Sequence, residues 1–260
     1  MLMSPKINRI LNKKNKSKII CLTAYSKNIA EEIDKYSDLI LVGDSLGSVL
    51  YNYKTTRKVT LSMMIEHSKS VREGVSKSLM IVDMPYNTYR TKAEALKNCK
   101  NVMKHTKCDG VKLEGGNKIK DIVQHLVINK IPILGHLGIM PQTAKGKFKS
   151  KGKTANERKQ IIRDSKILEK AGAFGIVLEC VENNLAKEIT KEISIPTIGI
   201  GSSNNCDGQI LVTDDILGLT KSKIKFVKKY IDLRSYIRKA VKKFKSEVSS
   251  KKYPTKKYSY

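Results

Sequence analysis

Ionisable side chains stand at one end of five short apolar segments of this sequence. The segments read LILVG, LMIVD, GVKL, IPILG and GIVL, and each contains a titratable residue or leads into one. These residues are Asp44, Asp83, Lys112 together with Glu114, His136, and Glu179. At the opposite ends of the same segments we expect no comparable groups. Acids, a lysine and a histidine crowded together are costly unless a cation or substrate compensates them, so the pattern predicts a binding site.

The carboxylates in this set favour a metal site. Asp44, Asp83 and Glu114 supply only oxygen ligands, which suit Mg²⁺ with positions left open for water or substrate. Zn²⁺ is disfavoured because His136 is the one nitrogen ligand among these residues and no cysteine is well placed. Taken alone, an Asp after a strand is more often a helix cap or turn former, and a single His is more often structural. The occurrence of ionisable residues at the same end of five segments is what favours a functional site.

The apolar segments themselves predict buried strands. They are four to seven residues long and mostly continuous, as in parallel strands covered on both faces. We place eight strands at 19–25, 39–43, 79–83, 110–113, 131–135, 175–178, 195–201 and 209–213. Segments with helical spacing lie between them at 27–36, 61–73, 91–105, 119–129, 156–171 and 183–192. This alternation predicts an α/β fold, a single (β/α)8 TIM barrel, although spacing alone does not exclude an open sheet. In such a barrel the active site forms at the C-terminal ends of the strands, where the ionisable residues stand.

The length of 260 residues fits one such barrel. We expect a single catalytic domain over 1–260, with an N-terminal segment at about 1–18 and basic C-terminal helices and a tail at about 223–260. No segment approaches about 18 uninterrupted apolar residues, and the first residues lack the apolar core of a signal peptide, so we expect no membrane span. Five cysteines without a Cys-x-x-Cys pair favour free thiols in a reducing cytosol, and hence a cytoplasmic protein.

The chain is strongly basic, with 51 Lys+Arg against 24 Asp+Glu and a formal net charge of +27. A charge of this size usually suggests a nucleic-acid partner. However, only eight of the basic residues are Arg, the side chain that binds phosphates and bases bidentately. The excess is also spread along the chain rather than gathered in one stripe. We therefore expect no specific nucleic-acid partner and interpret the excess of lysine as compositional drift.

Several longer motifs occur in a fixed order and spacing. They are VGDSLG at 42–47, DMP at 83–85, VKLEGG at 111–116, GHLG at 135–138, LECV at 178–181, IPTIGIG at 195–201 and DGQILV at 207–212. Together they resemble the ketopantoate hydroxymethyltransferase (3-methyl-2-oxobutanoate hydroxymethyltransferase) family. The resemblance covers roughly 7–230, nearly the whole chain.

The resemblance implies an activity. Members of the family transfer a one-carbon unit from 5,10-methylenetetrahydrofolate to 3-methyl-2-oxobutanoate, which gives ketopantoate in pantothenate and coenzyme A biosynthesis. They are Mg²⁺-dependent β/α barrels that assemble as large homo-oligomers, commonly decamers. Three lysines, Lys149, Lys151 and Lys153, lie near the mouth in sequence terms, and we expect them to attract the anionic folate tail.

Roles for individual residues follow from the same resemblance. It places Mg²⁺ on Asp44, Asp83 and Glu114. It places the oxo acid against Asp44, Ser45, Asp83 and Lys112. Glu179 becomes the proton acceptor, with His136 nearby. This agrees with the chemistry of the side chains, because Lys112 would bring positive charge to a developing enolate oxygen and a carboxylate can remove the acidified proton.

Departures from the family pattern fall outside these proposed contacts. Ser202 and Ser203 stand where Ala-Gly is usual, and Ser203 loses the access of glycine to positive φ. Glu182 replaces a usual Pro, Met140 a usual Thr, and the lysine-rich loop at 143–153 is shorter than usual. Two alternatives stay open: another Mg²⁺-dependent C–C lyase acting on 2-oxo acids, of the phosphoenolpyruvate/isocitrate lyase type, and a non-enzymatic polyanion-binding protein.

Overall fold

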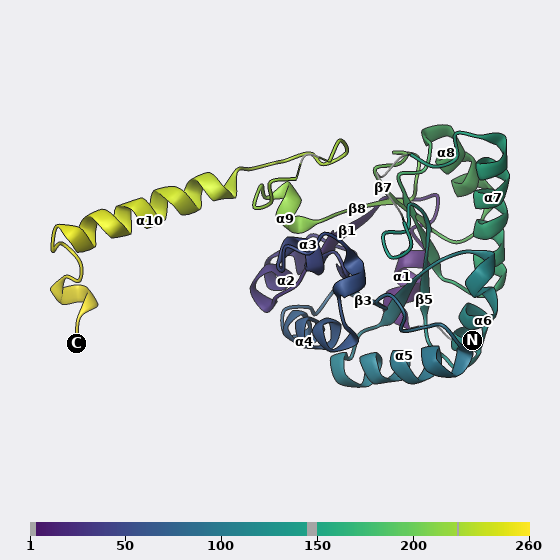
Figure 1. The fold of residues 1–260 in the computed structure, drawn as a ribbon, viewed down its shortest axis with the longest axis horizontal. Helices are drawn as coiled ribbons and strands as arrows, with labels where there is room; N and C mark the ends of the chain where they lie inside the picture. Colours follow the sequence, from purple (N-terminus) through teal and green to yellow (C-terminus); the bar gives the residue numbers. More distant parts are fainter. Residues whose placement is uncertain (1–3, 145–149, 223) are drawn as a thin grey trace. The chain divides into compact units, whose positions relative to one another are not determined.

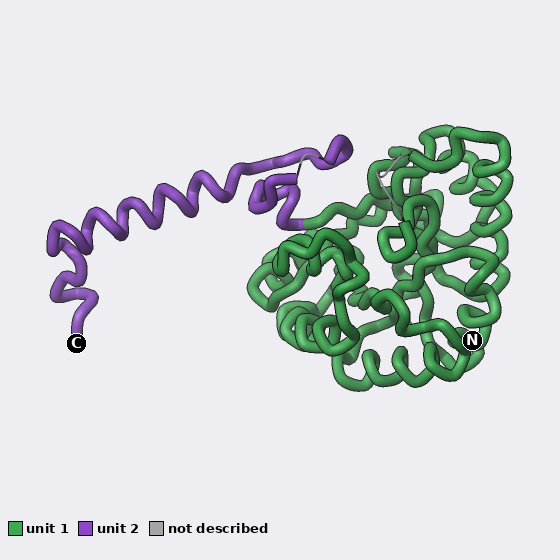
Figure 2. The backbone as a smooth tube through the Cα atoms, in the orientation of Figure 1, with its two compact units in different colours: residues 1–212 green, residues 213–260 purple. Residues whose placement is uncertain are grey.

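A computed structural model describes residues 4–144, 150–222 and 224–260. Lys149 of the basic loop therefore lies outside the described residues. The chain divides into two compact units, 1–212 and 213–260 (Figure 2). The sequence pattern indicates no boundary at this point. That all 260 residues act as one catalytic domain stays a prediction.

Eight parallel strands form a closed barrel in the first unit, in the order β1 to β8, with β8 pairing back to β1. Their bounds are β1 Ile19–Thr23, β2 Leu39–Val42, β3 Leu79–Asp83, β4 Gly110–Glu114, β5 Ile133–Gly138, β6 Gly175–Glu179, β7 Thr197–Ile200 and β8 Gly208–Leu211. All eight predicted strands are present, and the closed barrel confirms the predicted (β/α)8 fold over the open sheet.

Helices lie around the outside of these strands (Figure 1). The six predicted helical segments correspond to α2 Lys27–Asp34, α4 Leu61–Arg72, α5 Lys92–Thr106, α6 Lys120–Ile128, α7 Ala155–Lys170 and α8 Asn183–Glu192. The pattern did not predict α1 Pro5–Leu11, α3 Leu46–Val49, or the 3-10 turns η1 Thr56–Lys58 and η2 Asn117–Ile119. Thr60, Thr91 and Thr154 cap α4, α5 and α7 by accepting a backbone N–H of the first turn.

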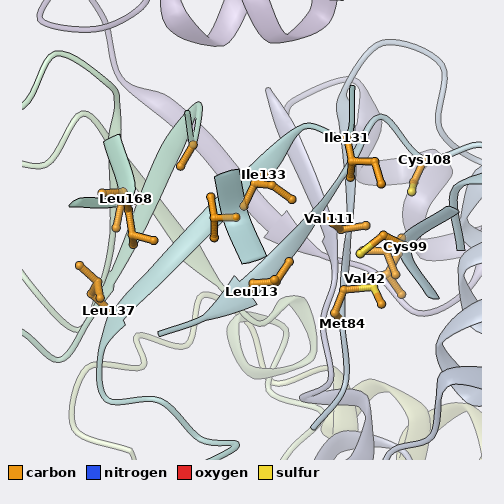
Figure 3. Close-up of a cluster of buried hydrophobic side chains, with 14 of the residues drawn as sticks. Val42, Met84, Cys99, Cys108, Val111, Leu113, Ile131, Ile133, Leu137 and Leu168 are labelled. Atoms are coloured by element: carbon orange, nitrogen blue, oxygen red, sulfur yellow. The ribbon is translucent and has the colours of Figure 1, made fainter. Parts of the chain in front are cut away.

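Alternation along the strands separates two hydrophobic clusters. One set of positions packs outward against the helices, and Figure 3 shows part of this layer, including Val111 and Leu113 of β4. The alternate set packs inside the barrel and includes Leu79 and Ile81 of β3. The inner cluster also takes in buried side chains of α1, so this helix closes the N-terminal end of the barrel.

Acidic residues also occur at the N-terminal ends of the strands, contrary to expectation. Asp38, Asp109 and Asp207 precede β2, β4 and β8, and each accepts a backbone N–H from a neighbouring strand. Each also lies near a lysine, as in the 2.8 Å pair between Asp207 and Lys14. These carboxylates tie α1 and its following turn to the barrel, so their role is structural.

The second unit contains α9 Thr213–Ile216, α10 Leu233–Ser249 and the 3-10 turn η3 Lys256–Tyr258. Asp232 caps α10 by accepting the backbone N–H of Ser235, and none of the residues of α10 is buried. Of the basic C-terminal helices predicted over about 223–260, the described residues form one α-helix, α10, and the short turn η3. In the described ranges, no helix is both long and apolar enough to cross a membrane. The five cysteines, all among the described residues, are free thiols as predicted.

Candidate active site

Side chains along each strand point alternately into and out of the barrel, and the predicted residues occupy inward positions at its mouth. Leu79 and Ile81 point inward, so Asp83 is the next inward position of β3. In β4 the outward positions are Val111 and Leu113. Lys112 and Glu114 therefore face inward, and the same alternation turns His136 of β5 and Glu179 of β6 to the inside. Register places Asp83 beside Lys112 and Glu114 beside His136.

Asp44 lies just beyond β2 and is buried. Its backbone N–H donates to Oδ2 of Asp83 at 3.0 Å, which brings these two predicted ligands together. Burial and the neighbouring Asp83 carboxylate raise the pKa of Asp44 to about 7. The next residue, Ser45, has its hydroxyl 2.8 Å from the Tyr25 hydroxyl. The contact holds Ser45 at the edge of the mouth, where the resemblance expects substrate.

Lys112 lies at the centre of the acidic group. Its Nζ is 2.9 Å from Oδ1 of Asp83 and 4.0 Å from Oε1 of Glu114. Burial opposes the charge of Lys112, but the attraction of Asp83, Glu114 and Asp44 outweighs burial and raises its pKa above the ordinary lysine value. The side chain is thus a fixed, buried cation at the mouth.

His136 connects Lys112 to Glu179. Nζ of Lys112 lies 3.2 Å from Nδ1 of His136, and an ammonium group only donates, so Nδ1 is the acceptor. Burial and the Lys112 charge lower the pKa of His136. The neutral ring therefore carries its proton on Nε2, which lies 3.3 Å from Oε2 of Glu179. The alignment of these atoms falls short of a hydrogen bond, but the imidazole presents a donor to the carboxylate.

The donor atoms fit an oxygen-preferring cation in part. Among the described residues, no group of three or more His, Cys, Asp or Glu side chains is gathered as a metal site. Yet Oε1 of Glu114 is buried and takes part in no hydrogen bond, whereas Oδ1 of Asp83 lies against the Lys112 ammonium. Burial also raises the pKa of Glu114 well above its ordinary value. Oxygen atoms left without hydrogen bonds among crowded acids are what a hard divalent cation would satisfy.

Sequence reasoning missed two residues of the site. Gln142 follows β5 and contacts both Asp44 and Glu114, and Tyr89 contacts Gln142. Neither side chain is charged at neutral pH, so the search for ionisable residues passed over them. The available signal was position, since Gln142 stands in the loop after a strand that carries His136.

Comparison with known proteins decides the family. A family model described as ketopantoate hydroxymethyltransferase matches residues 5–256. The chain belongs to the ketopantoate hydroxymethyltransferase family. A 3-methyl-2-oxobutanoate hydroxymethyltransferase of Pelagibacter ubique (strain HTCC1062) is 62% identical over 99% of this chain and 100% of its own length. One of the same name from Agrobacterium fabrum (strain C58 / ATCC 33970) is 46% identical over 93% of this chain and 88% of its own length. The resemblance noted in the motifs is thus confirmed.

Solved structures share the barrel at low identity. A 2,3-dimethylmalate lyase, a member of the PEP mutase/isocitrate lyase superfamily, has a TM-score of 0.66 and 12% identity, covering 94% of this chain and 89% of its own. A phosphonopyruvate hydrolase solved with oxalate and Mg²⁺ has a TM-score of 0.63 and 8% identity, covering 98% and 93%. Identities this low show the fold alone. Family membership, not the fold, therefore separates a hydroxymethyltransferase from a C–C lyase.

Proposed function

We propose that this protein transfers a hydroxymethyl unit from 5,10-methylenetetrahydrofolate to 3-methyl-2-oxobutanoate and so makes ketopantoate. Membership of the family supports the reaction class. The observation that carries the proposal is the set of inward-facing groups at one end of the barrel, in which a buried lysine, crowded acids and a neutral histidine surround a single mouth. These are the groups that removal of a proton beside a ketone requires.

Asp44, Asp83 and Glu114 are the residues that would hold Mg²⁺. The cation would supply Lewis acidity to the ketone oxygen of the substrate. The oxo acid would lie against Asp44, Ser45, Asp83 and Lys112. The buried Oε1 of Glu114, which takes part in no hydrogen bond, supports this assignment.

Glu179, His136 and Lys112 each have a separate role in the reaction. Glu179 accepts the proton from C3 of the oxo acid, and its partial exposure leaves it accessible to the substrate. His136 presents its Nε2–H to the Glu179 carboxylate from the neighbouring strand. Lys112 places its charge beside the oxygen that becomes negative as the enolate forms.

The carbon nucleophile completes the transfer. C3 forms a bond to the methylene carbon of the folate, and the bonds from that carbon to the folate nitrogens break. Water supplies the hydroxyl group, so the products are ketopantoate and tetrahydrofolate.

We also propose that the protein is cytoplasmic, acts as a homo-oligomer, with a decamer as the expected size, and has no specific nucleic-acid or membrane partner.

The direct test is an assay of the purified chain with 3-methyl-2-oxobutanoate, 5,10-methylenetetrahydrofolate and Mg²⁺. Ketopantoate should appear, and omission of either organic substrate should abolish it. Parallel incubations with 2,3-dimethylmalate and phosphonopyruvate test the lyase alternative. Turnover of one of these, without formation of ketopantoate, would contradict the proposal.

A further inference from the structure

Gln142 bridges two of the proposed metal ligands. It lies in the loop between β5 and α7 and is 1% exposed. Its side-chain Nε2 donates to Oδ2 of Asp44 at 2.9 Å, and its backbone N–H donates to Oε2 of Glu114 at 3.1 Å. One residue therefore contacts carboxylates that come from two different strand ends.

The orientation of the Gln142 amide is fixed by its surroundings. Nε2 also donates to the backbone carbonyl of Met84 at 2.9 Å, and a carbonyl can only accept. The nitrogen must therefore lie on this side, and Oε1 faces the Tyr89 hydroxyl at 2.6 Å. With the backbone carbonyl of Gln142 accepting from Nε of Arg57 at 2.8 Å, every polar group of this residue has a partner.

These contacts fix the orientation of the two carboxylates. With Oδ2 of Asp44 and Oε2 of Glu114 engaged by Gln142, the carboxylate planes are restrained. Oε1 of Glu114 is left without an aligned hydrogen bond. A ligand set restrained in this way loses less conformational entropy when a cation binds.

We infer that Gln142 is a positioning residue, which holds the Asp44 and Glu114 carboxylates in the arrangement that a divalent cation needs. The inference rests on the proposed function, because it assumes that these acids bind a metal. Tyr89 supports Gln142 through Oε1 at 2.6 Å and, more weakly, accepts the backbone N–H of Glu114 at 3.4 Å. Replacing Tyr89 should therefore reproduce a weaker form of the same effect.

The test measures binding of Mn²⁺ to the metal-free full chain, without substrate, by calorimetry and by the electron paramagnetic resonance spectrum of the bound ion. Gln142→Met keeps most of the buried volume and the backbone N–H to Glu114, but removes the donor to Asp44. We expect its Kd for Mn²⁺ to rise by about 10–100-fold, as for other residues that orient metal ligands, with an altered spectrum. Tyr89→Phe should raise the Kd by about 3–10-fold, the usual worth of one hydrogen bond.

Gln124→Ala is the matched control, because Gln124 is exposed on α6 and should leave the Kd unchanged. A Kd and spectrum in Gln142→Met equal to those of the wild type would overturn the inference and leave the metal assignment standing. If the wild-type chain itself binds no Mn²⁺, the metal assignment fails and the inference falls with it. Should Gln142→Met not fold, Gln142→Asn, which keeps an amide but withdraws it by one methylene from Asp44, decides, and an unchanged Kd in that variant rejects the role of Gln142.

Discussion

Nε2 of His136 lies 3.3 Å from Oε2 of Glu179, on the neighbouring strand of the barrel. Because Lys112 holds the other ring nitrogen as an acceptor, this Nε2 carries the proton. The histidine therefore presents a donor to the carboxylate and has no lone pair left for a substrate proton at that atom. This relationship supports the proposal that Glu179 is the base and that His136 faces it as a donor.

The first prediction concerns the metal. Asp83→Asn keeps the shape of the side chain but removes one charge from the proposed ligand set. The Mg²⁺ concentration that gives half-maximal activity should rise by at least about tenfold, and turnover should fall with it. Titration of activity against Mg²⁺ measures both, and circular dichroism shows whether the fold is kept. Asp121→Asn, at an exposed position of α6, is the control. An unchanged Mg²⁺ dependence in Asp83→Asn would mean that Asp83 is not a ligand.

A second prediction concerns stability and lies away from the site. Asp34 ends α2 and accepts the backbone N–H groups of Ser76, Lys77 and Ser78. Burial opposes its charge, but these hydrogen bonds outweigh burial and lower the pKa of Asp34 below its ordinary value. Asp34→Asn should therefore lower the free energy of unfolding at about pH 7 by roughly 2–3 kcal/mol.

The pH dependence of this loss has a definite sign. A carboxylate whose folded pKa lies below its unfolded value of about 3.9 stabilises the fold above that pH. Its contribution falls as the pH drops below the unfolded pKa towards the folded one. Urea unfolding of the wild type and Asp34→Asn at about pH 7 and at about pH 3 should show the difference shrinking in acid. Glu32→Gln, exposed on the same helix, controls for loss of charge. A difference that is the same at both pH values would contradict this account.

The third prediction is that the basic surface plays no part in sequence recognition. The protein should bind nucleic acid only non-specifically, with a Kd of roughly 10⁻⁴–10⁻⁶ M at physiological salt. Fluorescence anisotropy with unrelated duplexes should give similar values that weaken steeply as salt is added. A nanomolar complex with one sequence at that salt would instead support the polyanion-binding alternative.

The barrel could be predicted from sequence because its strands are continuous apolar segments. This pattern is local, so it is visible without knowledge of tertiary contacts. For β5 the pattern predicts 131–135 rather than Ile133–Gly138, because the apolar Ile131 extends its start and the less apolar GHLG hides its end. The short α1 was missed although Ser4 caps it and Pro5 begins it, since its two buried isoleucines make a weak pattern. Gln142 was missed because an amide acquires its role only from the partners that the fold brings to it.

Two of the positions that the resemblance marks as departures from the family pattern, Glu182 and Ser203, have local explanations in the fold. Glu182, which stands where Pro is usual, caps α8 by accepting the backbone N–H groups of Asn184 and Leu185. Ser203 is buried and has no positive φ, so the loss of glycine there causes no backbone strain. Its hydroxyl accepts the backbone N–H of Asn205. Neither change touches the proposed site.

The proposed removal of the C3 proton of the oxo acid by Glu179 can be measured as exchange of that proton with solvent. Glu179→Gln keeps the shape of the side chain and removes the base. With Mg²⁺ and 3-methyl-2-oxobutanoate in deuterated water, nuclear magnetic resonance measures loss of the C3 proton without any need for folate. The account predicts exchange slower than wild type by about 10²–10⁴-fold, with binding of the oxo acid and Mg²⁺ nearly intact, while Glu32→Gln exchanges normally. Exchange at the wild-type rate in Glu179→Gln would contradict this role for Glu179, and His136 would become the next candidate only with the opposite tautomer, in which Nε2 is an acceptor.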